Sequence, residues 1–310
     1  MNKFAKYSII IGLALVFISI IFSAGNLNHL WESFDGLGNH SQNEHIVIND
    51  DIESLVINVR NMRVRIKGFS GDNIRINYRH DERNPISITE YDGVLSIQKE
   101  YNRNWQLFSL NFRIPELVIK VPSDLILYYN IASTNASINV NNLNILDSTF
   151  RTSNSSITLS NINTDYNLEV RSANGRINLD NLEAELIIAQ SSNARINASN
   201  ILAYDLSLTS SNGRISIQDI ETEKVNITTS NSRIDFRNLD SNDIELRSSN
   251  GRIEGSIIGN REDFQKNIRT SNGRIMIDGE NHGTIINDRI ELDQIIRAQT
   301  SNGRIDLTFR

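Results

Sequence analysis

Residues 210–228 read Ser-Ser-Asn-Gly-Arg-Ile-Ser-Ile-Gln-Asp-Ile-Glu-Thr-Glu-Lys-Val-Asn-Ile-Thr. Ile215 and Ile217 alternate with polar residues in this stretch. Val225 and Ile227 do the same further along. Alternation with a period of two is typical of a strand with one buried face. The stretch therefore predicts one coil of chain that holds two short strands joined by two corners.

This stretch contains one of nine copies of a six-residue phrase, Ser/Thr-x-Asn-Gly/Ala/Ser-Arg/Ser-Ile. The asparagines of the nine copies are Asn135, Asn154, Asn174, Asn193, Asn212, Asn231, Asn250, Asn272 and Asn302. Their successive spacings are 19, 20, 19, 19, 19, 19, 22 and 30 residues. A fixed period of about 20 residues indicates a solenoid, whose coils bury their apolar faces against their neighbours. The predicted fold class is all-β, a parallel β-solenoid with about 19–20 residues per coil.

Each copy of the phrase ends in isoleucine, which we expect to face the core and to contribute about 1.5–3 kcal/mol by burial. These residues are Ile138, Ile157, Ile177, Ile196, Ile215, Ile234, Ile253, Ile275 and Ile305. A second polar column follows seven residues after the first and predicts the opposite corner. It consists of Asn142, Asn161, Asn181, Asn200, Asp219 and Asn238. Turn geometry and stacked amides explain both columns, so neither is assigned a binding role.

The composition excludes several classes of function. The chain has 310 residues, a formal net charge of −6 and no cysteine. The charge argues against nucleic-acid binding by bulk electrostatics, and the lack of cysteine excludes disulfides, thiol catalysis and thiolate zinc sites. The five histidines have no metal-ligand spacing, and no phosphate-binding loop is present. We therefore predict no cofactor, no metal and no nucleic-acid partner.

The N-terminus predicts a membrane segment. Lys3 and Lys6 precede an apolar run over residues 7–24, and the next Lys or Arg is Arg60. This asymmetry places the N-terminus in the cytoplasm and the remainder outside the cell. A cleaved signal peptide is one reading, but the run is longer than the usual ~7–15 residues of such peptides. We favour a single-pass transmembrane helix that anchors the chain in the cell membrane.

The chain divides into four expected segments. Residues 1–25 form a cytoplasmic tip and transmembrane anchor, and residues 26–44 form a juxtamembrane linker. Residues 45–131 form an irregular β-rich start of the solenoid, in which residues 61–64 resemble a degenerate repeat. Residues 132–310 form the regular coils. Their last two copies carry insertions, which we expect to fold over the end of the stack.

An arginine precedes the buried isoleucine in seven copies and therefore points outward. The column consists of Arg176, Arg195, Arg214, Arg233, Arg252, Arg274 and Arg304. Coil spacing predicts a basic stripe about 29 Å long. Acidic residues at Asp235, Glu254 and Asp306 are placed to neutralise their own coils, whereas the middle coils have none. The stripe is either a site for anionic polymer or lipid headgroups, or a solvated row of surface charge.

Asp235 and Glu254 occupy equivalent positions of adjacent coils, ~5 Å apart. Paired carboxylates on a β-helix occur in polysaccharide-cleaving enzymes. A deep groove with further acids or a lysine beside the pair would indicate such an enzyme. A flat face would favour binding or a spacer.

With its N-terminal apolar segment, the phrase Leu117-Val118-Ile119-Lys120-Val121-Pro122 and the Ser-x-Asn-Gly-x-Ile coils from Ser133 onward, the chain resembles a bacterial "putative adhesin" family. This family of β-strand-repeat envelope proteins includes the LiaG-like proteins. The resemblance spans about residues 45–310. It implies a membrane-tethered, outward-facing β-solenoid associated with envelope stress, and no catalytic residues carry over from it.

These observations together predict a non-catalytic, membrane-tethered extracellular β-solenoid. It would act as an adhesin-like envelope-binding or stress-associated module. Its expected partners are the membrane, anionic wall polymer, lipid headgroups or an envelope-stress membrane protein. The alternatives are a polysaccharide-acting β-helix enzyme and a passive structural spacer.

Overall fold

A computed structural model describes residues 42–47, 52–79, 85–99, 115–289 and 291–310. It separates residues 1–42 from a second unit, residues 43–310, and only the second is described below. The predicted anchor, residues 7–24, lies outside the described residues, as do residues 26–41 of the predicted linker. Within the described ranges, no helix is long and apolar enough to cross a membrane.

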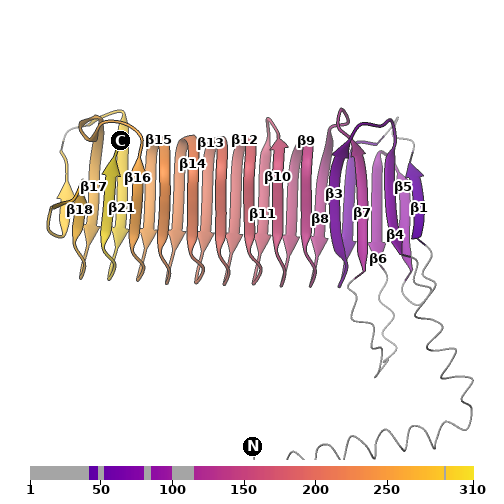
Figure 1. The fold of residues 1–310 in the computed structure, drawn as a ribbon, viewed down its shortest axis with the longest axis horizontal. Coiled ribbons are helices and arrows are strands. Elements are labelled where there is room, and N and C mark those ends of the chain that lie inside the picture. The colour runs from indigo at the N-terminus through magenta and orange to yellow at the C-terminus, as the bar shows by residue number, and fades with distance from the viewer. Residues whose placement is uncertain (1–41, 48–51, 80–84, 100–114, 290) are drawn as a thin grey trace, which may run out of the picture. The chain divides into compact units, whose positions relative to one another are not determined.

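The middle of this unit is a stack of coils in register. Its strands are β9 (Ile138–Thr152), β10 (Ile157–Asn163), β11 (Asn167–Ser172), β12 (Ile177–Ser191), β13 (Ile196–Ser210), β14 (Ile215–Thr229) and β15 (Ile234–Ser248). Successive strands pair in parallel, and Ile177, Ile196 and Ile215 stand opposite one another. Figure 1 shows them as a row of equivalent coils. The predicted all-β solenoid is therefore confirmed.

Each regular coil has three faces, not the two expected from the sequence. In β13 the inward residues alternate along Ile196 and Ala198, then along Ile201 and Ala203, and then from Leu206 to the end of the strand. Two consecutive side chains point outward at each bend between these faces. The bends do not end the strand, although the pairing with the neighbouring coils skips Asn200 and Tyr204, so one 15-residue strand turns twice. The short middle face was missed because it holds only two inward residues.

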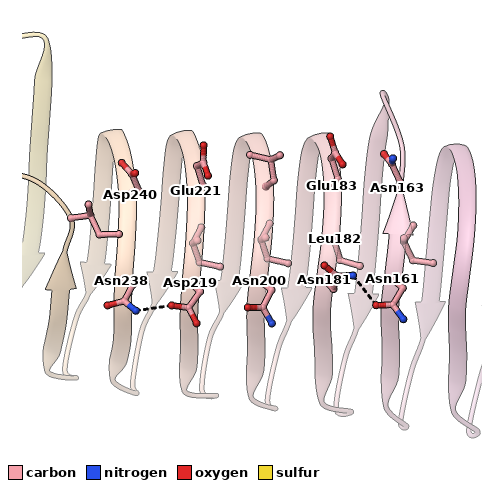
Figure 2. Close-up of a pocket in the computed structure, with 15 residues that line it drawn as sticks. Asn161, Asn163, Asn181, Leu182, Glu183, Asn200, Asp219, Glu221, Asn238 and Asp240 are labelled. Atoms are coloured by element: carbon pink, nitrogen blue, oxygen red, sulfur yellow. Dashed lines mark hydrogen bonds between the residues drawn. The ribbon is translucent and has the colours of Figure 1, made fainter.

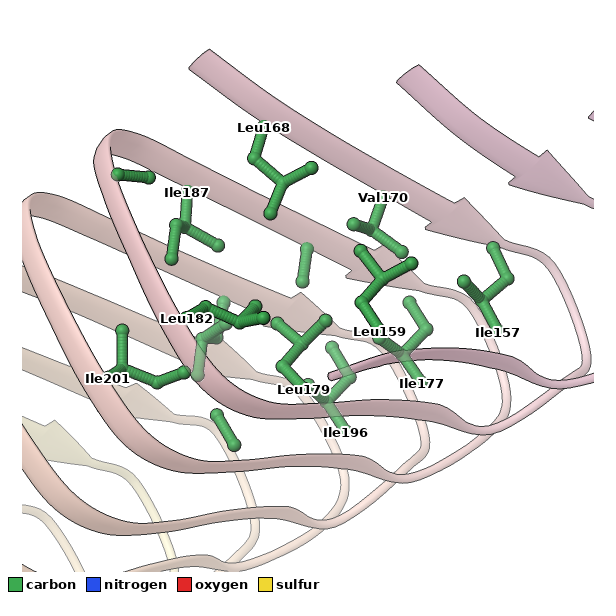
Figure 3. Packing of buried hydrophobic residues seen from close by; sticks show 14 of the residues in the cluster. Ile157, Leu159, Leu168, Val170, Ile177, Leu179, Leu182, Ile187, Ile196 and Ile201 are labelled. Carbon is green, nitrogen blue, oxygen red and sulfur yellow. The ribbon is translucent and has the colours of Figure 1, made fainter. Parts of the chain in front are cut away.

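The core is a column of aliphatic side chains that runs along the stack. The nine isoleucines that end the phrase are all 0% exposed. Leu182 and Ile187 face them from the other two sides of the coil, and Figure 3 shows this packing. Because each coil shares this core with its neighbours, no coil is buried alone. The inward orientation predicted for the isoleucine column is confirmed.

The serine or threonine that opens the phrase is buried at the corner. In one coil, the Ser210 hydroxyl accepts a hydrogen bond from the Gly213 N–H at 2.9 Å. It also donates to the Ala194 carbonyl of the preceding coil at 3.1 Å. A buried hydroxyl needs such partners, because an unsatisfied one costs stability. The phrase therefore begins with Ser or Thr for a structural reason.

The glycine of the phrase is explained by close approach and not by a left-handed backbone. A Cβ at Gly213 would lie 1.8 Å from the Ala194 carbonyl oxygen. The left-handed conformation occurs instead at the second polar column, where Asn200 has φ 55° and Asp219 has φ 53°. Asn and Asp tolerate this conformation better than other residues that carry a side chain. The second column therefore marks a corner, as predicted.

At the N-terminal end, the coils are stacked out of sequence order. The strands are β1 (Gln42–Val47), β2 (Ser54–Val59), β3 (Arg63–Phe69), β4 (Ile74–Arg79), β5 (Ile86–Tyr91), β6 (Val94–Lys99), β7 (Glu116–Pro122) and β8 (Leu127–Ser133). β2 pairs with β6 on one side and with β8 on the other. β3 likewise lies between β7 and β9. The first coil of the chain is thus the second coil of the stack, and residues 61–64 are its repeat corner.

The C-terminal end has the same arrangement. Its elements are β16 (Ile253–Ile257), the 3-10 turn η1 (Arg261–Asp263), β17 (Phe264–Thr270), β18 (Ile275–Ile277), β19 (Glu280–Asn281), β20 (Ile285–Asn287), β21 (Gln294–Thr300) and β22 (Ile305–Phe309). β21 pairs with both β15 and β17, and β22 pairs with both β16 and β18. Figure 1 shows β21 between β15 and β17. The last coil of the chain is therefore inserted before the coil that precedes it in sequence.

Antiparallel strands cover the outermost coils. β4 and β5 pair antiparallel with β7 and β6 at one end. β20 and β19 pair antiparallel with β17 and β18 at the other end. Open sheet edges promote aggregation, and these strands occupy part of each edge. The insertion that supplies β19 and β20 folds over the end of the stack, as expected.

Candidate functional site

The seven arginines of the predicted stripe line one outer edge of the coils. Their order along the stack is Arg176, Arg195, Arg214, Arg233, Arg252, Arg304 and Arg274, because the last coil is inserted out of sequence. The stripe predicted from the sequence had Arg274 before Arg304, and this order is wrong. Arg214 and Arg304 are partly covered, and the other five are exposed.

Acidic side chains neutralise the stripe over four consecutive coils. Arg252 contacts Glu254 at 2.7 Å, and Arg304 contacts Asp306. Arg233 lies 3.2 Å from Asp235. The intracoil neutralisation expected for these three arginines is confirmed.

Arg214 is neutralised as well, which the sequence reading did not expect. Its own coil carries Ser216 in the acidic position, but the guanidinium reaches the Asp235 carboxylate of the next coil. Parallel stacking brings Ser216 and Asp235 side by side, so an arginine can pair across coils as well as within one. The expectation that the middle coils cannot neutralise their arginines is therefore wrong for Arg214.

Arg176 and Arg195 form the unneutralised part at one end of the stripe, and Arg274 at the other end makes no ion pair among the described residues either. Arg176 and Arg195 are both exposed, and among the described residues neither makes an ion pair. They occupy adjacent coils, ~4.8 Å apart along the stack. In the position two residues on, the Asn197 amide donates to Asn178 at 2.8 Å, so this edge carries amides instead of acids. Guanidinium groups backed by amides suit an anion.

Three carboxylates stack where the stripe is neutralised. Asp235, Glu254 and Asp306 lie on consecutive coils of the structure, because the inserted last coil brings Asp306 beside Glu254. Burial raises the pKa of Asp235 above its ordinary value, although the charges of Arg214 and Arg233 oppose this shift. The hydrogen bond from Arg252 lowers the pKa of Glu254.

Asp306 is therefore a third acid beside the pair Asp235 and Glu254, as expected for a polysaccharide-cleaving enzyme. The deep groove expected for such an enzyme is not found beside the pair among the described residues. A depression of about 270 Å³ lies beside Glu254 and Asp306, and Asp235 is not part of its wall. All three carboxylates are in contact with arginines. An acid held in an ion pair is less available for proton transfer, so the arrangement favours a structural charge network.

A larger groove, of about 690 Å³, runs along the middle face of the coils. One side is the corner column, represented by Asn161, Asn181, Asn200, Asp219 and Asn238. The other side is a row two residues further on, Asn163, Glu183, Leu202, Glu221 and Asp240. Figure 2 shows the two rows on successive coils. Buried aliphatic residues, Ile162, Leu182, Ile201 and Ile220, lie between them.

The sequence reading missed this groove, because it assigned the corner column no role beyond turning the chain. The signal was present in the alternation that restarts after each corner. In the coil of Asn200, the outward Leu202 and Tyr204 follow the corner two and four residues on. That pattern marks a separate face with its own outward side chains.

A family model described as Toastrack DUF4097 matches residues 52–186 and again residues 163–288. No curated protein is significantly similar to the sequence.

Two solved structures resemble the chain at low identity. One is described as a putative cell adhesion protein from Clostridium sporogenes, with 11% identity and a TM-score of 0.23, and it covers 88% of this chain and 100% of its own. The other is described as a putative adhesin from Bacteroides fragilis, with 12% identity and a TM-score of 0.38, and it covers 88% of this chain and 98% of its own. At these values neither likeness supports a conclusion about function.

Proposed function

Because the chain belongs to the Toastrack DUF4097 family, which confirms the expected resemblance, we propose that it is a non-catalytic, adhesin-like module that binds anionic polymer in the cell envelope. In this proposal residues 7–24 anchor it in the membrane, with the N-terminus in the cytoplasm and the solenoid outside. The basis for the anchor is the lysine-flanked apolar run.

The uneven neutralisation of the arginine stripe is the observation that carries the binding proposal. Arg176 and Arg195 are adjacent, exposed and without an ion pair to any described residue, whereas the next four arginines along the stack contact acids and Arg274 stands alone at the far end. Arginine binds phosphate and carboxylate oxygens through parallel N–H groups. Two such groups on adjacent coils are spaced to contact successive charges of an anionic chain.

The test compares two double variants in the full-length protein. Arg176→Gln/Arg195→Gln removes two positive charges from the unpaired end, and Arg233→Gln/Arg252→Gln removes two from the paired part. Binding to purified teichoic acid is measured over a range of salt concentrations. We expect the first variant to lose most of the binding and most of its salt dependence. The second should bind nearly as well as the parent.

Equal losses in the two variants would show that only net charge matters. Undiminished binding by the first variant would refute the stripe and favour the spacer. The anchor has a separate test, in which external protease should digest residues 43–310 of protein that fractionates with membranes. Recovery of a soluble form that begins near Asn26 would instead indicate a cleaved signal peptide.

The stacked acids keep a polysaccharide-cleaving enzyme as the second candidate, because the pKa values of Asp235 and Glu254 are displaced in opposite directions. Such divergence is typical of acid and base pairs in active sites. The ion pairs and the shallow surface beside them favour the binding module. Release of reducing ends from wall polysaccharide by the parent protein, and its loss in Glu254→Gln, would reverse this order.

A further inference from the structure

We propose that the groove on the middle face binds an extended polysaccharide that carries no acidic groups. This site is distinct from the arginine stripe and does not depend on the anionic ligand proposed above. The groove follows five coils, from Asn161 to Asn238 in the corner column. Four coil steps make it ~19 Å long, enough for several sugar units in a row.

The charge of the groove excludes an anionic ligand. Its lining contains four carboxylates, those of Glu183, Asp219, Glu221 and Asp240, and none of the lining residues is basic. Hydrogen bonds from Asn238 and then Gln218 lower the pKa of Asp219, with a smaller effect of the Arg237 charge. The Asp219 carboxylate is therefore ionised at neutral pH. An acidic polymer would be repelled, whereas hydroxyl or ammonium groups would be attracted.

A break in the corner ladder leaves acceptors without donors in the middle of the groove. In the regular ladder, each side-chain amide donates to the preceding coil, as Asn181 does to Asn161 at 2.8 Å. Asp219 has no N–H to donate to Asn200, and the Asn200 amide turns to Asp180 at 3.0 Å. The Asn200 side-chain oxygen accepts no hydrogen bond from the described residues. Because Asn200 is exposed, this oxygen is open to the O–H or N–H groups of a ligand.

Exposed tyrosines follow just beyond the outer row of the groove, and Tyr204 is the next outward residue after Leu202. Tyr204 is 62% exposed and Tyr166 is 46% exposed. The coil between them carries Glu185 in the equivalent position, because the Glu185 N–H donates to the Tyr166 carbonyl and Ala184 stands opposite Ala203. The two rings are thus two coils apart, ~9.6 Å along the stack.

Aromatic rings beside planar amides and carboxylates suit a pyranose chain. Such rings present an apolar face and a polar edge, and a sugar ring likewise carries C–H groups on its faces and hydroxyls around its edge. A basic peptide fits less well, since side chains on one face of an extended peptide repeat every ~6.8 Å and not at ~4.8 or ~9.6 Å. The spacing and the tyrosines therefore favour a glycan.

The test measures retardation of the full-length protein in gels that contain one soluble polymer each. The polymers are hydroxyethyl cellulose, which is neutral, chitosan, which bears amines, and polygalacturonate, which is acidic. Polylysine is tested in solution as the polycation. We expect binding to the first two and none to polygalacturonate. Binding to polylysine alone would overturn the glycan assignment in favour of a basic peptide, and no binding to any polymer would overturn the site.

Matched variants locate the site. Tyr204→Ser should weaken glycan binding about tenfold, whereas Tyr128→Ser, at a tyrosine of 44% exposure in β8 and so beyond the five coils of the groove, should not. Asp219→Asn supplies the missing amide and should weaken binding about fivefold, while Asp124→Asn should leave it unchanged. Glycan binding that survives both Tyr204→Ser and Asp219→Asn would refute the proposal. Neither variant changes Arg176 or Arg195, so this test and that of the stripe can fail separately.

Discussion

Deletion of residues 305–310 is expected to unfold the C-terminal end of the stack and not merely to shorten it. The deleted segment contains β22, which lies between β16 and β18. Ile305 and Leu307 are both 0% exposed, and at about 1.5–3 kcal/mol each the deletion removes about 3–6 kcal/mol of apolar burial. β16 and β18 are then left ~9.6 Å apart, too far to hydrogen-bond to each other.

Amide hydrogen exchange reports this change region by region. The shortened protein should lose protection in β17 and β18, because their partner coil is incomplete. Protection in β13 and β14 should remain, since regular coils contact only their neighbours. Thr308→Ala, at an exposed position of β22, should leave the exchange pattern unchanged.

Engineered cysteines test the coil order directly, because the chain has no cysteine of its own. The Ser301 N–H donates to the Ser249 carbonyl at 3.0 Å, so these residues lie on adjacent coils. Adjacent coils place Cα atoms within the 4.4–6.8 Å range of a disulfide. Ser249→Cys/Ser301→Cys should cross-link and Ser249→Cys/Ser271→Cys should not. Cross-linking of the second pair, or full protection of β18 in the shortened protein, would refute the inserted coil.

Three further outcomes test the coils themselves. Ile215→Asn should destabilise by about 3–6 kcal/mol through lost burial and a buried amide, whereas Ser216→Asn should have little effect, and equal urea midpoints would show that the strand register is wrong. Gly213→Val should lower the midpoint more than Ala194→Val, because its Cβ would lie 1.8 Å from a carbonyl oxygen; the reverse order would argue against close approach. The pKa of Glu254 is lowered from its ordinary value of 4.5, so its ion pair stabilises the folded protein above pH 4.5, and this stabilisation is lost as the pH falls through the lowered pKa. Glu254→Gln should therefore lose less unfolding free energy than the parent between pH 5 and pH 3 in urea titrations. An unchanged acid profile would mean that Glu254 is not held in its ion pair.

The regular coils were predictable because their pattern is local. The alternation around Ile215 and the 19-residue spacing determine which side chains are buried and which coils are neighbours. The third face was harder to predict, since Ile201 and Ala203 are too few to show a period. The inserted coils were not predictable, because the same phrase at Asn272 and Asn302 fits either stacking order.

The candidate sites likewise divide into features that follow from the local repeat pattern and features that depend on the three-dimensional structure. The arginine column and three of its acidic partners followed from the repeat register. The pairing of Arg214 with Asp235 depends on side-chain reach across coils, which the spacing does not give. The groove depends on the corner at Asn200, where the position of two outward rows is set by backbone conformation.

Because the first and last coils of the chain are each held one place inside the stack, the length of the middle is independent of both ends. A duplication of one regular unit, such as residues 196–214, would add a rung without disturbing either terminal arrangement. The arginine stripe and the groove, which both run along the stack, would each become ~4.8 Å longer. The number of regular coils therefore determines both the length of the stack and the length of its groove, and the two change together in whole coils.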